Sequence, residues 1–209
     1  MRILRSLPVL LALFILAACG GGEDNVVSDR GSSAAMPTAI PAADGTVHTR
    51  TLATVMDTGE GAGRPELCLG AVAESYPPQC SGLSLVGWRW SDHNGVFEKS
   101  GSTRWGLFAV TGTFDGSAVT VESAVPAALY DAMVVEPTPE PAGPESDPAE
   151  LRRIQAEVED LPGFLSAAPG DGFVAVEVVH DDGSLQAWAD GEYGDGVVRI
   201  TSALVPASS

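Results

Sequence analysis

Three cysteines carry the most specific chemistry in this 209-residue chain. Cys68 and Cys80 lie twelve positions apart, and Pro77 and Pro78 turn the chain between them. Two thiols at this spacing form a disulfide in an oxidising compartment and act as a reactive or metal-binding pair elsewhere. No second pair of ligands accompanies them, and their spacing differs from that of the close cysteine pairs in zinc fingers. The choice therefore depends on the compartment to which the protein is delivered.

The third cysteine, Cys19, ends an apolar run of about a dozen residues that follows Arg2 and Arg5. Such a run has the length of a signal-peptide core and falls short of the roughly 20 residues that cross a bilayer. It closes with Leu-Ala-Ala before Cys19, and residues 20–22 are glycines. This segment resembles the lipobox of bacterial lipoproteins. The resemblance implies cleavage between Ala18 and Cys19, and attachment to membrane lipid through acyl chains such as palmitate on Cys19.

Delivery to the extracytoplasmic face of the cell membrane, or secretion, favours a Cys68–Cys80 disulfide, because that side of the membrane is oxidising. A looser resemblance to uncharacterised exported lipoproteins of high-GC Gram-positive bacteria supports the same pairing. It rests on residues 65–70, 77–80 and 193–198, and it implies no activity. The alternative for the N-terminus is an uncleaved signal anchor with a chance cysteine.

The formal net charge of −17 limits the partners of the protein. A polyanion of this size is repelled by phosphate backbones, so we expect no nucleic-acid binding. It is also repelled by anionic lipid, so lipidation at Cys19 must supply membrane attachment.

No motif predicts a catalytic residue, a metal site or a cofactor. The chain has no nucleophile elbow, no phosphate-binding loop and no paired-histidine motif. His48, His93 and His180 are scattered, and we expect each to be exposed or hydrogen-bonded. The acidic clusters at 181–182 and 190–195 could bind calcium weakly, but turn and helix-cap roles fit them better.

Tryptophans offer a possible ligand surface. Trp88 and Trp90 alternate on one face of a predicted strand, and Trp105 begins a later strand. Tryptophans on a sheet surface could stack on the sugar rings of a wall polymer. Core packing is the alternative, and it is the stronger one.

The elements that position these residues divide the chain into five parts. Residues 1–18 are the signal peptide, 19–46 a flexible lipid-anchored tether, 47–133 a β-rich module, 134–148 a Pro/Glu-rich linker and 149–209 a small second module. The alternative is one domain with a long surface excursion at the linker. The predicted fold class is α+β.

The first module is predicted to be a small barrel or sandwich. Asp115-Gly116 is its best hairpin signal. The strand count makes an oligonucleotide/oligosaccharide-binding-like barrel one candidate. Strands are expected at 47–55, 67–72, 84–90, 104–114 and 117–125.

The second module is predicted to be a two-layer α-β-α-β unit. Its expected elements are a helix at about 148–160, a buried strand at 173–179, a helix within 182–193 and a last strand at 197–205. The alternative to the second helix is a pair of hairpins that turn at residues 182–183 and 195–196. A unit of this size makes a thin core, so we expect it to dock on the first module.

The sequence favours a non-catalytic binding or accessory role in the cell envelope, with a wall polymer or an envelope protein as partner. A structural or assembly partner of another envelope protein is the second interpretation, and a wall-acting hydrolase the third. Neither the ligand nor the oligomeric state is predicted.

Overall fold

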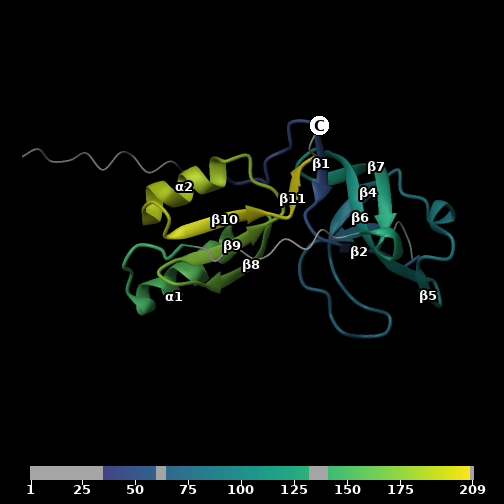
Figure 1. Ribbon diagram of the computed structural model, residues 1–209, viewed down its shortest axis with the longest axis horizontal. Coiled ribbons are helices and arrows are strands. Elements are labelled where there is room, and N and C mark those ends of the chain that lie inside the picture. Colours follow the sequence, from purple (N-terminus) through teal and green to yellow (C-terminus); the bar gives the residue numbers. More distant parts are fainter. Residues whose placement is uncertain (1–34, 60–64, 132–140, 208–209) are drawn as a thin grey trace, which may run out of the picture. The chain divides into compact units, whose positions relative to one another are not determined.

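The computed structural model describes residues 35–59, 65–131 and 141–207. The predicted signal peptide, the cleavage site at Ala18 and Cys19 and part of the tether lie outside these residues. Within them, no helix is long and apolar enough to cross a membrane. The architecture is α+β, as predicted: a closed five-stranded barrel, and a small sheet with two helices (Figure 1).

The barrel confirms one of the two predicted β architectures, a small barrel or a sandwich. Its strands pair in the ring order β2–β3–β4–β7–β6 and back to β2, and only β4 and β7 run parallel. Counted along the chain, the five barrel strands therefore follow the ring order 1-2-3-5-4-1. The strands are β2 (Ala53–Asp57), β3 (Glu66–Cys68), β4 (Leu83–Val86), β6 (Thr103–Phe114) and β7 (Ala118–Pro126).

Three shorter strands extend the barrel along β6. β5 (Glu98–Ser100) pairs with the start of β6, whereas β1 (Thr46–Thr49) pairs with its end and with β11 (Leu204–Pro206). The single strand predicted at 47–55 is therefore wrong. It breaks after Thr49, whose hydroxyl accepts a hydrogen bond from the backbone N–H of Val110 at 3.1 Å. The N–H of Val110 lies between the part of β6 that pairs with β1 and the part that pairs with β2. The Thr49 hydroxyl therefore gives it a partner that neither strand supplies.

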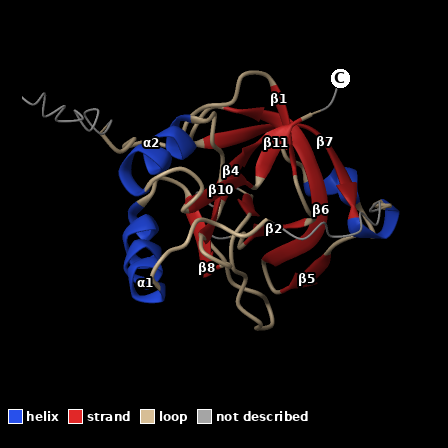
Figure 2. Ribbon diagram, turned by 60° about the vertical axis from the view of Figure 1, so that its left-hand side comes forward, coloured by secondary structure: helices blue, strands red, loops and turns tan. Residues whose placement is uncertain are grey.

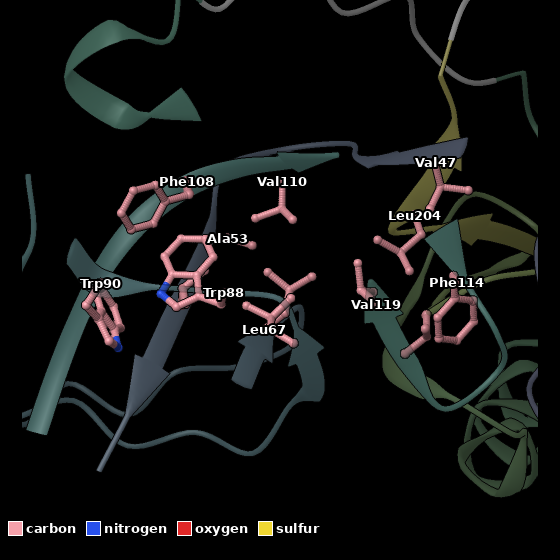
Figure 3. Packing of buried hydrophobic residues seen from close by; sticks show 13 residues of the cluster. Val47, Ala53, Leu67, Trp88, Trp90, Phe108, Val110, Phe114, Val119 and Leu204 are labelled. Carbon is pink, nitrogen blue, oxygen red and sulfur yellow. The ribbon is translucent and has the colours of Figure 1, made fainter. Parts of the chain in front are cut away.

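The barrel core follows from side-chain alternation along β6. Phe108, Val110 and Phe114 point inward and are almost fully buried. Figure 3 shows Trp88, Trp90 and Phe108 gathered at one end of this core. Val47, Phe114, Val119 and Leu204 lie at the other end.

The second sheet has the order β10–β9–β8, and both of its helices lie on one side of it (Figure 2). Val174, Val176 and Val178 of β9 face the helices, because alternate residues of a strand share a face. The bounds are α1 (Pro148–Glu157), β8 (Phe164–Pro169), β9 (Val174–Val178), α2 (Ser184–Tyr193) and β10 (Val198–Ser202), with single 3-10 turns η1 (Trp90–His93), η2 (Ala127–Leu129) and η3 (Val158–Asp160) elsewhere.

The predicted α-β-α-β order is incomplete. β8 was not expected, because its Ser-Ala-Ala-Pro stretch lacks β-branched residues. The helix within 182–193 forms and the two alternative hairpins do not, since β9 and β10 are parallel and need a crossover. The strand predicted at 197–205 divides at Ala203 into β10 and β11.

Glutamines from the two helices cap both edges of this sheet. The Gln186 side chain donates from Nε2 to the Val198 carbonyl at 2.9 Å and accepts the N–H of Ile200 at 2.8 Å. On the opposite edge, Nε2 of Gln155 donates to the Ala167 carbonyl at 3.1 Å. These amides occupy backbone groups that would otherwise be available to a further strand.

The C-terminal segment links the two sheets. While β11 pairs with β1, the preceding Ala203 and then Leu204 donate backbone hydrogen bonds to the carbonyls of Val178 and Val179, at 2.8 and 2.9 Å. Near this junction, Arg50 forms an ion pair with Glu177 at 2.6 Å.

Candidate functional site: an apolar groove on the barrel

A disulfide between Cys68 and Cys80 confirms the predicted pairing. It closes the loop between β3 and β4 over the outer face of the barrel. Cys68, Met56 and Trp105 form a small buried cluster beneath this loop, and Val72 and Cys80 pack against it. Three strands thus contribute outward-facing side chains that the loop shields from solvent.

The possible tryptophan surface does not form, and the stronger interpretation, core packing, is confirmed. Trp88, Trp90 and Trp105 are only 8%, 6% and 8% exposed. Trp88 and Trp90 follow the end of β4 and enter the barrel core against Phe108. They are therefore not on the face of a strand, as the alternation in the sequence suggested. Since all three tryptophans are buried, none offers an open ring to a saccharide.

Trp105 is covered by the edge of Tyr76, whose ring centroid lies 5.3 Å away at a nearly perpendicular angle. Tyr76 itself is 73% exposed. The disulfide loop therefore buries one large aromatic ring and presents another.

The histidines lie apart from one another. His93 stacks on Trp88 with a centroid distance of 4.3 Å, and burial lowers its pKa because the protonated ring loses water, although Asp92 opposes this shift. His180 is buried with Nδ1 3.2 Å from the Leu204 carbonyl oxygen. No group of three or more His, Cys, Asp or Glu side chains is placed to hold a metal ion among the residues that the structure describes.

The acidic cluster at 181–182 caps α2. Asp181 accepts hydrogen bonds from the backbone N–H groups of Leu185 and Gln186, and Asp182 accepts one from Ser184. Hydrogen bonds from the Ser184 side chain, and then from its backbone N–H, lower the pKa of Asp182, because they favour its charged form. Both carboxylates therefore have structural partners.

The outward face of β6 remains apolar beyond the disulfide loop. Strand register places Leu107 opposite Thr54 of β2, and Ala109 opposite Val125 of β7. Leu107 is 49% exposed and Val125 40% exposed. A soluble surface normally places polar side chains at such outward positions.

Of these residues, Thr54 and Leu107 line a groove of about 570 Å³, which we call the β6 groove. Its floor is β2 and β6, and its walls come from the disulfide loop, the segment before β5, and η2. Leu129 of η2, beside the groove, is 74% exposed. The lining residues are Thr54, Pro78, Gly95, Val96, Phe97, Glu98, Trp105, Gly106, Leu107, Pro126, Ala127 and Ala128.

Close backbone packing fixes one wall of the groove. A Cβ atom at Gly106 would lie 2.7 Å from the Phe108 ring and 3.3 Å from the Val96 carbonyl oxygen. A side chain at residue 106 would therefore clash with the Phe108 ring and crowd the segment before β5.

A larger hollow of about 930 Å³ lies between residues 142–148, α1 and the turn after β8. Of the large apolar side chains that are exposed in the described parts of the chain, none lines it. Volume alone does not indicate binding, so we assign the candidate site to the smaller β6 groove, which the exposed side chain of Leu107 lines.

No family model matches the chain, and no curated protein or solved structure is significantly similar to it. The strand order of the barrel therefore stands as topology alone, and topology does not determine a ligand.

Proposed function

We propose that this protein is a membrane-anchored envelope lipoprotein whose folded part binds another protein without catalysis. The observation that carries the proposal is the β6 groove, which exposed Leu107 lines, while exposed Val125 and Leu129 adjoin the lining residues Pro126 and Ala128 in the sequence. Exposed apolar side chains that gather at a concave surface are typical of interaction sites.

A protein partner fits this groove better than a wall saccharide. Sugars are bound by exposed aromatic faces and by converging hydrogen-bonding groups, and the three tryptophans proposed for stacking are buried. The apolar side chains in the lining instead include Leu107 and Phe97. Burying such carbons against an apolar side chain contributes roughly 25 cal/mol per Å².

The anchor part of the proposal depends on the lipobox resemblance. Since only the Cys19 thiol can take the diacylglyceryl group, Cys19→Ala should abolish metabolic labelling with fatty acid. The variant should then accumulate as precursor or be released from the cell. Persistence of the label on this variant would refute lipidation at this residue.

The groove is tested by a photo-crosslinking amino acid at position 129, in the full chain expressed in its own envelope. Leu129 is suitable because its side chain is largely exposed, so its replacement disturbs little packing. We expect a discrete protein adduct, which Leu107→Asn should weaken. The matched control is the same amino acid at Glu159, an exposed position on η3.

Equal adduct formation from positions 129 and 159 would count against a specific site. Hydrolysis of wall material by the purified protein, lost on changing a single Asp, Glu, His or Ser, would favour the enzyme alternative instead.

A further inference from the structure

We propose that the β6 groove accepts a short linear segment of the partner, with an apolar anchor residue flanked by Lys or Arg. This inference rests on the proposed function and adds the chemistry of the partner.

The size of the groove favours a linear segment over a broad docking surface. A volume of about 570 Å³ is comparable to that of a small-ligand pocket and accommodates a few large side chains. Broad protein interfaces bury about 800 Å² on each partner, on rather flat surfaces. A peptide with one or two apolar anchors can fill a groove of this size without such an area.

Strand alternation sorts the charges of β5 and β6 between two faces. Glu98 is opposite Trp105, so its side chain lies on the groove face and contributes to the lining. Lys99 is opposite Arg104, and this pair is adjacent along the strands to the pair of Glu98 and Trp105. Because successive residues of a strand point to opposite faces, Lys99 and Arg104 belong to the reverse face. The groove face of this hairpin is therefore acidic, although the hairpin as a whole carries two cations.

Two further exposed acids lie in, or just after, segments that supply lining residues of the groove, namely the disulfide loop and η2. Glu74 precedes Tyr76 by two residues, and Asp131 follows Leu129 by two residues. With a net charge of −17, the whole chain adds a long-range field that attracts cations. A largely apolar lining that includes Glu98, in a strongly acidic chain, is complementary to an apolar anchor with basic neighbours.

The same charges disfavour two other occupants. A second copy of this chain would bring an equally acidic surface to the groove, and anionic lipid would bring phosphates. Like charges that meet across an interface oppose association. A basic segment of another protein is the occupant that the charges support.

The test uses three fluorescein-labelled synthetic peptides and the purified full chain in detergent micelles, with binding read by fluorescence anisotropy. One peptide has a Leu-Val-Leu centre with two arginines on each side. The second has the same centre with two glutamates on each side, and the third has a Gly-Ser centre with the arginines.

We expect the first peptide to bind at least about tenfold more tightly than the other two, and its affinity to fall as salt is raised. Glu98→Gln should weaken it by about twofold to fivefold, the range of a partly exposed ion pair. Glu159→Gln, which removes a distant exposed acid, should leave it unchanged. Leu107→Asn should weaken the binding of both peptides that have the apolar centre.

Equal binding of the arginine and glutamate peptides would overturn the inference, even if the cellular crosslink at position 129 remained. Equal binding of the Gly-Ser peptide, or binding insensitive to Leu107→Asn, would show attraction to the acidic chain at large and would also overturn it. Loss of the crosslink itself would instead count against the proposed function.

Discussion

Gln186 is predicted to stabilise the second sheet by acting as a substitute strand. Its side chain satisfies the Val198 carbonyl and the Ile200 N–H, and donates to Asp190 at 2.9 Å. Each bond contributes about 1 kcal/mol net, and an unsatisfied half-buried backbone group costs about 1–3 kcal/mol. Since water can replace part of what is lost, Gln186→Ala should lower the free energy of unfolding by about 2–3 kcal/mol.

Gln186→Glu separates the two hydrogen-bonding roles without changing size. A carboxylate can still accept from Ile200, but it would meet the Val198 carbonyl and the Asp190 carboxylate without a proton to donate. We therefore expect this variant to be destabilised at neutral pH and to recover partly in acid, where a protonated Glu can donate.

The assay is urea unfolding of the mature protein, combined with hydrogen exchange of the Ile200 amide. Gln155→Ala is the matched control, because it removes one edge bond and should cost about 1 kcal/mol. A change below about 0.5 kcal/mol in Gln186→Ala, within the range of neutral surface substitutions, or unchanged exchange at Ile200, would refute the edge-capping argument.

Three further predictions concern the barrel and the helices. Replacing Cys68 and Cys80 by Ala together should lower the free energy of unfolding by about 3 kcal/mol, because the unfolded chain regains loop entropy; unchanged urea midpoints would contradict this. Burial lowers the pKa of His93, so the stability that its neutral form provides should be lost as pH falls below about 6.5, and His93→Phe should remove that component from a pH series of thermal melts. Gly82→Ala should destabilise the barrel by more than about 2 kcal/mol in thermal or urea unfolding, because its Cβ would lie 2.2 Å from the Leu67 carbonyl oxygen. Gly191→Ala in α2 should instead stabilise the protein by up to about 1 kcal/mol, because a Cβ there meets open space and alanine favours a helix.

Local chemistry made some features predictable from the sequence. The Asp115-Gly116 hairpin forms because Gly116 takes a positive φ of 93° and the Asp115 carboxylate accepts the N–H groups of Ser117 and Ala118. The same bonds lower the pKa of Asp115. The disulfide was predicted from two nearby cysteines together with the oxidising compartment that the lipobox resemblance implied. Such features depend on a few neighbouring residues.

Other features depend on contacts between distant segments and could not be read locally. β8 forms because β9 and Gln155 offer it hydrogen-bonding partners, and not because its own residues favour a strand. The break after Thr49 depends on β6 and β11, which lie far along the chain.

The candidate site did leave a signal in the sequence, which alternation explains. Residues 105–110 (Trp-Gly-Leu-Phe-Ala-Val) contain no polar side chain, whereas a strand with one solvated face should alternate. The inward set, with Phe108 and Val110, fills the barrel. The outward-facing residues, Trp105 and Leu107, need another segment to shield them from solvent. The disulfide loop shields Trp105. Leu107 is the first outward residue beyond that cover, so the run predicts an unfilled apolar site once its register is known.

The disulfide loop connects the shape of the candidate site to the redox state of the compartment. Pro78, which lies between the two cysteines, forms part of the groove wall, and Tyr76 of the same loop covers Trp105. The loop is joined to the barrel through Cys68 at the end of β3, next to Met56 and Trp105. If the thiols were reduced, the loop would keep its sequence but lose the constraint that holds this wall beside β6. An oxidising compartment therefore favours the stability of the fold and, by the same bond, the shape of the groove.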